Sequence, residues 1–146
     1  MGPIELVAAG VVLLVAVVLG TVAHELSHAT VLAAFGVPYR IEWLPARAQA
    51  GLLRAGVLGG WASVTPREIP SGLAPWRLRV AALAPLALAV PFALVFAGVL
   101  PDPIASGNPL VQAATVGWLA CALPSPADFS LFSHAGRAIE EYGGSG

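Results

Sequence analysis

The feature that most constrains the fold is a long apolar segment near the N-terminus that leads directly into ionisable residues. Residues Ile4 to Val22 are almost all Val, Leu, Ala and Gly, and as a helix this length crosses about 30 Å of hydrocarbon. The helical pattern continues through residues 24–28, which read HELSH, as far as Phe35, and Gly36 should then end it. We therefore expect a membrane-spanning helix that carries two histidines and a glutamate near its end.

Composition also favours a membrane protein. Hydrophobic residues make up 58% of the chain and charged residues 10%, which is too apolar for an ordinary soluble domain. The net charge is −1 and no basic cluster is interleaved with aromatic residues, so we expect no nucleic-acid partner. A secretory signal peptide is the alternative for the N-terminal segment, but that segment lacks a basic start and is too long.

We predict a mainly α-helical membrane protein with one domain over residues 1–142 and a flexible tail over 143–146. Three core transmembrane helices are expected at about 4–35, 77–100 and 110–123, with a small β-hairpin at about 38–66 between the first and second spans. Pro85 and Pro91 should kink the second span and free backbone carbonyls, which neighbouring helices can satisfy.

The hairpin is predicted from an alternating pattern. Tyr39, Ile41 and Trp43 alternate with charged residues, and a period of two suits a half-buried strand. A second candidate strand runs from Val57 to Thr65. An amphipathic loop is the alternative for this region.

A carboxylate follows the third apolar segment. Prolines at 124 and 126 bias the backbone there away from helix, and irregular backbone at membrane depth is tolerated only where it is buried in protein or lines a cavity. Asp128 comes next, and we expect it to be either a metal ligand or the N-cap of a helix from Phe129 to Glu141. His134 is a second choice of ligand, but we expect it on the surface of that helix.

The arginines predict an orientation. Six of the seven lie from Arg40 to Arg79, in the connection between the first and second spans or at the start of the second, so this connection should be cytoplasmic by the positive-inside rule. The chain would then be a multi-pass integral membrane protein. Both HELSH and Asp128 would arrive at a similar depth near the cytoplasmic side.

The HELSH residues indicate metal chemistry. His24 and His28 share one face of a helix and lie about 6 Å apart along its axis, as in the H-E-x-x-H pattern of zinc proteases. Together with Asp128 and a water, they would give the open coordination of a catalytic zinc site, with Glu25 as general base. Iron(II) also suits two histidines and one carboxylate. The alternative is a pair of interfacial histidines without a metal.

Peptide hydrolysis at such a site would require an extended substrate, because a helix keeps its carbonyls in internal hydrogen bonds. An exposed strand edge near Val57 to Thr65 could hold an extended segment by β-augmentation. We therefore expect the substrate to pair with this edge.

Three motifs together resemble the site-2 protease family of intramembrane zinc metalloproteases. They are HELSH at 24–28, Ala84-Pro85-Leu86, and the segment LPSPAD at 123–128, and the resemblance covers nearly the whole chain as a minimal three-span core. It implies that His24, His28 and Asp128 bind zinc and that Glu25 activates water. It also implies that membrane-anchored proteins or peptides are cleaved within the lipid bilayer.

Four positions depart from the family pattern. The family's second span often carries a Gly before its proline and an Asn three residues after it, where this chain has Ala84 and Leu88. Its third motif often has an Asn before the first proline and a Gly after the ligand aspartate, where this chain has Leu123 and Phe129. A missing Asn bears on substrate handling, since it can donate to an oxyanion or to substrate backbone. Zinc binding does not depend on these positions.

Two other classes of function are open. The main alternative is a non-catalytic, zinc-containing membrane protein that binds transmembrane clients, although such a protein would not need Glu25. A haem or metal carrier is the third class. The spacing of His24 and His28 on one helix face suits a single ion better than the two faces of a haem.

Overall fold

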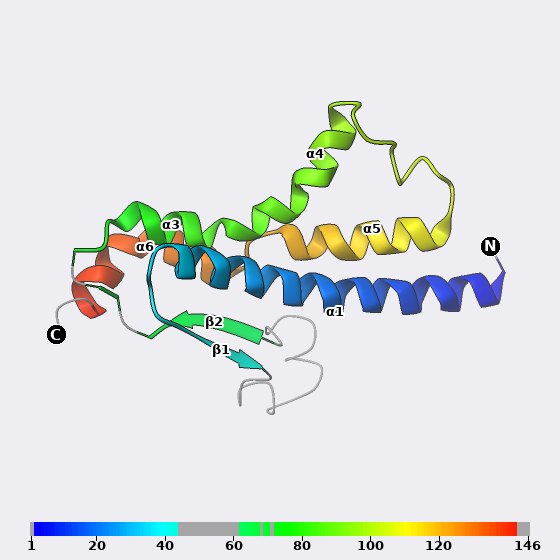
Figure 1. Cartoon of the computed structure of the whole chain (residues 1–146). Helices are drawn as coiled ribbons and strands as arrows, with labels where there is room; N and C mark the ends of the chain where they lie inside the picture. The colour runs from blue at the N-terminus through cyan, green and yellow to red at the C-terminus, as the bar shows by residue number, and fades with distance from the viewer. Residues whose placement is uncertain (1, 44–61, 68, 71, 143–146) are drawn as a thin grey trace. The chain divides into compact units, whose positions relative to one another are not determined.

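The computed structural model describes residues 2–43, 62–67, 69–70 and 72–142, which are mainly helical (Figure 1). The elements in chain order are α1 (Pro3–Ala34), β1 (Tyr39–Trp43), β2 (Ala62–Pro66), α3 (Pro75–Ala82), the 3-10 helix η2 (Ala84–Ala89), α4 (Val90–Phe96), α5 (Pro109–Ala122) and α6 (Pro126–Tyr142). The contacts within the chain divide it into two units. We call Met1–His24 with Pro85–Leu123 the apolar unit, and Glu25–Ala84 with Pro124–Gly146 the sheet unit.

Two helical segments are long and apolar enough to cross a membrane, and this is compatible with a membrane location. They are Pro3–Ala34 and Pro109–Glu140, and there are three if the bent pair Pro75–Ala82 and Ala84–Phe96 counts as one span. The second segment differs from expectation, because it comprises α5 and most of α6 rather than residues 110–123 alone. The three-span topology and its orientation stay predictions.

Small residues pack α5 against the N-terminal part of α1 in the apolar unit (Figure 1). A Cβ atom added at Gly20 would lie 2.8 Å from the Cys121 side chain, and one added at Gly117 would lie 3.0 Å from Ala16 Cβ. Ala16 and Gly20 are four residues apart, as are Gly117 and Cys121, which is the small-xxx-small spacing that lets membrane helices approach closely.

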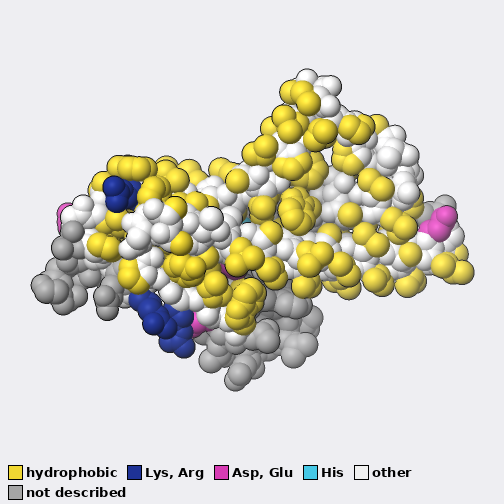
Figure 2. Space-filling view, viewed as in Figure 1, with side chains coloured by type: hydrophobic (Ala, Val, Ile, Leu, Met, Phe, Trp, Pro, Cys, Tyr) yellow, Lys and Arg dark blue, Asp and Glu magenta, His cyan; other side chains and the backbone are white. Residues whose placement is uncertain are grey.

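The outer surface of the apolar unit is hydrophobic. Large side chains along α1 are strongly exposed, among them Leu6 at 65% and Leu14 at 67%, and Figure 2 shows hydrophobic side chains along this part of the molecule. Such a surface is unusual for a soluble protein, in which large contiguous apolar patches mark an interaction site. It suits contact with lipid.

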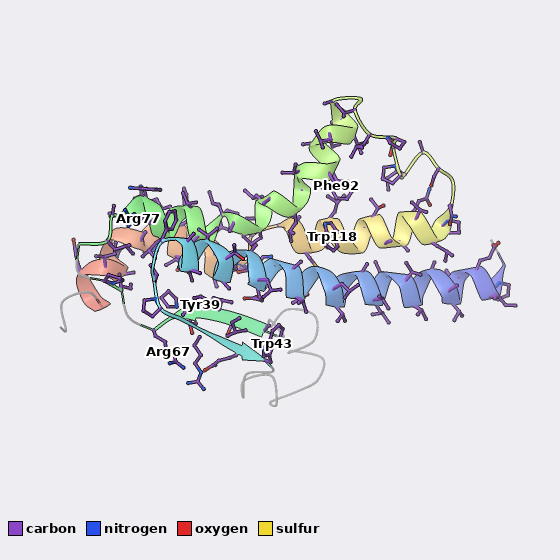
Figure 3. The ribbon with its side chains drawn as sticks, viewed as in Figure 1. Tyr39, Trp43, Arg67, Arg77, Phe92 and Trp118 are labelled. Carbon is purple, nitrogen blue, oxygen red and sulfur yellow. The ribbon has the colours of Figure 1, made fainter. Side chains whose placement is uncertain are left out.

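Two prolines explain the broken helix that follows α3. In the 3-10 pattern of η2, the carbonyl of Leu88 would pair with the N–H of residue 91, but Pro91 has none. The indole Nε1 of Trp118 donates to the Leu88 carbonyl instead, at 3.1 Å. Figure 3 shows Trp118 on α5 together with Phe92 on α4. The predicted release of carbonyls by proline is therefore confirmed here.

The sheet unit has a conventional hydrophobic core. Its buried members come from the end of α1 and the loop after it, the loop before α3, α3 itself and α6, and they are Leu32, Val37, Ile69, Leu73, Leu78, Ala81 and Ala135. Leu78 is fully buried. At the rim of this core, the Arg77 guanidinium lies 5.7 Å from the ring centroids of both Phe35 and Trp76, within cation–π range.

Strands β1 and β2 form the predicted antiparallel hairpin. Their register runs from Tyr39 opposite Pro66 to Trp43 opposite Ala62. The alternating pattern of residues 39–43 is therefore confirmed as a strand. Residues 57–61 of the predicted second strand lie outside the described part of the chain.

Candidate metal centre

The two histidines of HELSH are buried near the C-terminal end of α1. His24 is 9% exposed and His28 is 8% exposed, and their spacing of four places both on one helix face. Together with Asp128, which is 9% exposed, they form a group whose ligand atoms all lie within 4.8 Å of one another. Among the described residues, this buried group could hold a metal ion.

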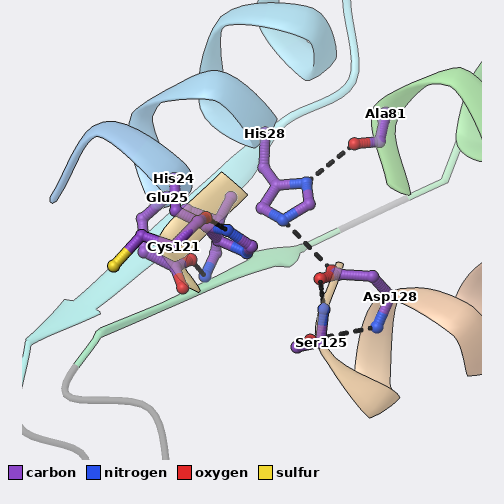
Figure 4. Close-up of polar contacts among 8 residues, drawn as sticks. His24, Glu25, His28, Ala81, Cys121, Ser125 and Asp128 are labelled. Atoms are coloured by element: carbon purple, nitrogen blue, oxygen red, sulfur yellow. Dashed lines mark hydrogen bonds and ion pairs between the residues drawn. The ribbon is translucent and has the colours of Figure 1, made fainter. Parts of the chain in front are cut away.

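Each histidine ring is oriented by a backbone carbonyl (Figure 4). The Nδ1 atom of His24 lies 2.8 Å from the Cys121 carbonyl oxygen, and Nδ1 of His28 lies 2.7 Å from that of Ala81. A carbonyl oxygen only accepts, so both Nδ1 atoms carry the proton and donate. Nε2 is then the nitrogen left to bind a metal. Metal-binding histidines usually have such a partner, which fixes the tautomer and the ring orientation.

Helix breaks supply both carbonyls. The residue four positions after Ala81 is Pro85, which has no N–H to offer within the helix. The residue four positions after Cys121 is Ser125, whose N–H donates to Asp128 Oδ2 at 2.6 Å instead. The Pro85 break therefore leaves the Ala81 carbonyl accessible to His28, and the contact of Ser125 with Asp128 does the same for the Cys121 carbonyl.

Asp128 is held by a capping box at the start of α6. Its N–H donates to Ser125 Oγ at 3.2 Å, while its Oδ2 accepts from the Ser125 N–H, the reciprocal pair typical of a helix N-terminus. Asp128 is therefore not the N-cap that the sequence predicts as one of two roles, because Ser125 is the cap and α6 begins at Pro126 rather than Phe129. Asp128 uses one oxygen for the box, and its Oδ1 lies 3.1 Å from His28 Nε2.

The donor set fits a divalent transition metal. Two ligands of a tetrahedral zinc ion with bonds of about 2.0–2.1 Å lie about 3.3 Å apart, close to the 3.1 Å between His28 Nε2 and Asp128 Oδ1. Two imidazoles and one carboxylate suit zinc with an open position, and they also suit iron(II). The three ligand atoms together lie within 4.8 Å of one another, so the group could hold such an ion.

Glu25 follows His24 on α1 and lies half-buried. Its Oε2 accepts a hydrogen bond from the backbone N–H of Val64 in β2, at 3.0 Å. Strand β2 therefore contacts the candidate base directly through this hydrogen bond. Nothing in the sequence pattern indicates this contact, since it depends on where β2 lies in space.

The remaining candidates fall outside the group. His134 is exposed on α6 and its Nδ1 lies 3.1 Å from the Ser130 carbonyl, so it is a surface residue as expected. Phe129 is also exposed. Sequence reasoning missed Ser125, although Ser-x-x-Asp before an apolar stretch is a recognisable capping box.

Comparisons with protein-family models, curated protein sequences and solved structures found no significant match.

Proposed function

We propose that the protein is an intramembrane zinc metalloprotease that resembles the site-2 protease family. His24, His28 and Asp128 would hold the ion, and Glu25 would act as general base. The observation that supports this most strongly is that both buried histidines donate Nδ1–H to a backbone carbonyl, so that each presents Nε2 as a ligand. A chance pair of interfacial histidines has no need of this arrangement.

A zinc ion in this group would supply a Lewis acid and a water of lowered pKa. Glu25 would take the proton from the attacking water and return it to the leaving amine, which completes hydrolysis of one peptide bond. The capping box would hold Asp128, and the carbonyls of Ala81 and Cys121 would hold the rings. Little reorganisation would then accompany the reaction.

The exposed hydrophobic surface of the apolar unit supports a substrate that is itself in the membrane. We propose that the substrate is a membrane-anchored protein or peptide, and that the protein is a multi-pass membrane protein with its site toward the cytoplasmic side. The arginine distribution supports this orientation.

The test combines metal analysis with a cleavage assay in detergent. Wild type, Glu25→Gln, Asp128→Ala and the control His134→Ala would be compared on a set of transmembrane peptides. We expect one zinc per chain in wild type, Glu25→Gln and His134→Ala, reduced zinc in Asp128→Ala, and cleavage only in wild type and His134→Ala. Zinc binding without cleavage of any peptide would instead favour a non-catalytic protein that binds transmembrane clients.

A further inference from the structure

The outer edge of β2 can be identified from the register of the hairpin. The Arg67 N–H donates to the Pro38 carbonyl at 2.9 Å, just beyond the pair of Tyr39 and Pro66. Hydrogen-bonded pairs alternate along an antiparallel ladder, so Arg40 with Thr65 is the next such pair. Val64 and Ile41 therefore form a non-hydrogen-bonded pair, and the Val64 N–H points away from β1.

The acceptor at this edge is a side chain rather than another strand. Glu25 Oε2 lies 3.0 Å from the Val64 nitrogen, where the carbonyl of a neighbouring strand would otherwise lie. A carboxylate that accepts from a backbone N–H makes a stronger hydrogen bond than a neutral carbonyl does. Glu25 therefore occupies the position that an added strand would need.

The sequence already predicts that this edge holds an extended peptide segment; we propose that Glu25 competes with such a segment for the Val64 N–H. Pairing of the segment would replace the Glu25–Val64 contact. A segment that stays helical has no carbonyl to offer and would leave the contact intact. This inference rests on the proposed function only in identifying the bound segment as substrate.

The proline at position 66 supports a short binding edge. Ala62, Val64 and Pro66 are the residues of β2 whose backbone nitrogens face the outer edge. Ala62 and Val64 each carry an N–H there, whereas Pro66 has none. An added strand can therefore use few backbone N–H donors at this edge. The contact with Glu25 takes the Val64 N–H, which is a large part of them. Competition by one carboxylate is then sufficient to oppose binding.

The test measures peptide binding rather than cleavage. A fluorescein-labelled peptide of alternating Thr and Val would be added to the full chain in detergent, and the initial rise in anisotropy would be recorded before hydrolysis. We expect Glu25→Ala to bind this peptide about tenfold more tightly than wild type. The peptide no longer has to displace the hydrogen bond between the Val64 N–H and a charged carboxylate. Glu25→Gln should lie between them, because its amide oxygen still accepts.

Two controls isolate the edge. Glu42→Ala changes a carboxylate on β1 away from this edge and should bind as wild type does. Val64→Pro removes the contested N–H at an edge position that tolerates proline, and should lose binding while it keeps its zinc. Unchanged affinity in Glu25→Ala, or wild-type affinity in Val64→Pro, would overturn the proposal.

The outcome is separable from that of the protease proposal. A chain that cleaves peptides but shows no gain of affinity in Glu25→Ala refutes only the competition at β2. A chain that cleaves nothing but shows the tenfold gain refutes only the protease.

Discussion

The apolar unit exposes many large hydrophobic side chains, whereas the sheet unit buries a hydrophobic core. All seven arginines belong to the sheet unit, whereas the apolar unit carries only Glu5 and Asp102 as charged residues. Most of the exposed large hydrophobic side chains lie in the apolar unit, and the buried core cluster lies in the sheet unit.

The difference shows which force stabilises each unit. In the sheet unit, side chains such as Leu78 leave water, so the hydrophobic effect stabilises the packing. In the apolar unit, helices pack through small residues and interhelical hydrogen bonds, as expected where lipid is the surrounding medium. The two units should therefore respond differently to the same kind of substitution.

The largest effect is expected from a core truncation in the sheet unit. Leu78→Ala should destabilise the protein by about 2–5 kcal/mol, because it removes buried methyl groups and leaves a cavity. Thermal unfolding in detergent measures this change. The control is Val80→Ala on the same helix, where the side chain is 44% exposed, and an equal loss in both variants would contradict the assigned core.

A smaller loss should follow from overpacking in the apolar unit. Gly20→Val would place its Cβ 2.8 Å from the Cys121 side chain, and we expect a loss of about 1–3 kcal/mol. The matched control is Gly10→Val in the same helix, where nothing lies within 4 Å of the added atom. If both glycines tolerate valine equally, the close approach of α1 and α5 is wrong.

The capping box offers an effect that appears in stability and metal affinity together. Ser125→Ala removes the acceptor for the Asp128 N–H and should cost about 1 kcal/mol, with zinc bound at least about tenfold more weakly. Competition with a chelator measures the second quantity. Ser130→Ala, an exposed serine on the same helix, should change neither, and unchanged zinc affinity in Ser125→Ala would show that the box does not orient the ligand.

The smallest effect concerns the hydrogen bond that satisfies the carbonyl freed by Pro91. Trp118→Phe keeps an aromatic ring but removes the donor to Leu88, and we expect a loss of about 1 kcal/mol. Trp43→Phe, at a ring that is 53% exposed, is the control. A loss no greater than in the control would mean that the Leu88 carbonyl finds another donor.

The features that can be predicted from the sequence are those that depend on a local pattern. The alternation at residues 39–43 predicts β1, and the HELSH spacing places His24 and His28 on one face of α1. Proline chemistry predicts that carbonyls near Pro85 and Pro91 become available, and both Ala81 and Leu88 accept from side chains.

The rest depends on how segments meet, which a single sequence does not encode locally. Which donor reaches the Ala81 carbonyl, and which N–H meets Glu25, are tertiary facts. The start of α6 is different, because the Ser-x-x-Asp pattern from Ser125 to Asp128 is a local capping box and already predicts a helix that begins at Pro126.

The most direct test of the central claim is X-ray absorption at the zinc edge of the purified chain in detergent. We predict a nitrogen and oxygen shell at about 2.0–2.1 Å, with scattering from two imidazoles and no sulfur at about 2.3 Å. His28→Ala should lose one imidazole. A sulfur ligand from Cys121, or a spectrum that His28→Ala leaves unchanged, would contradict the assignment of His24, His28 and Asp128 as the metal centre.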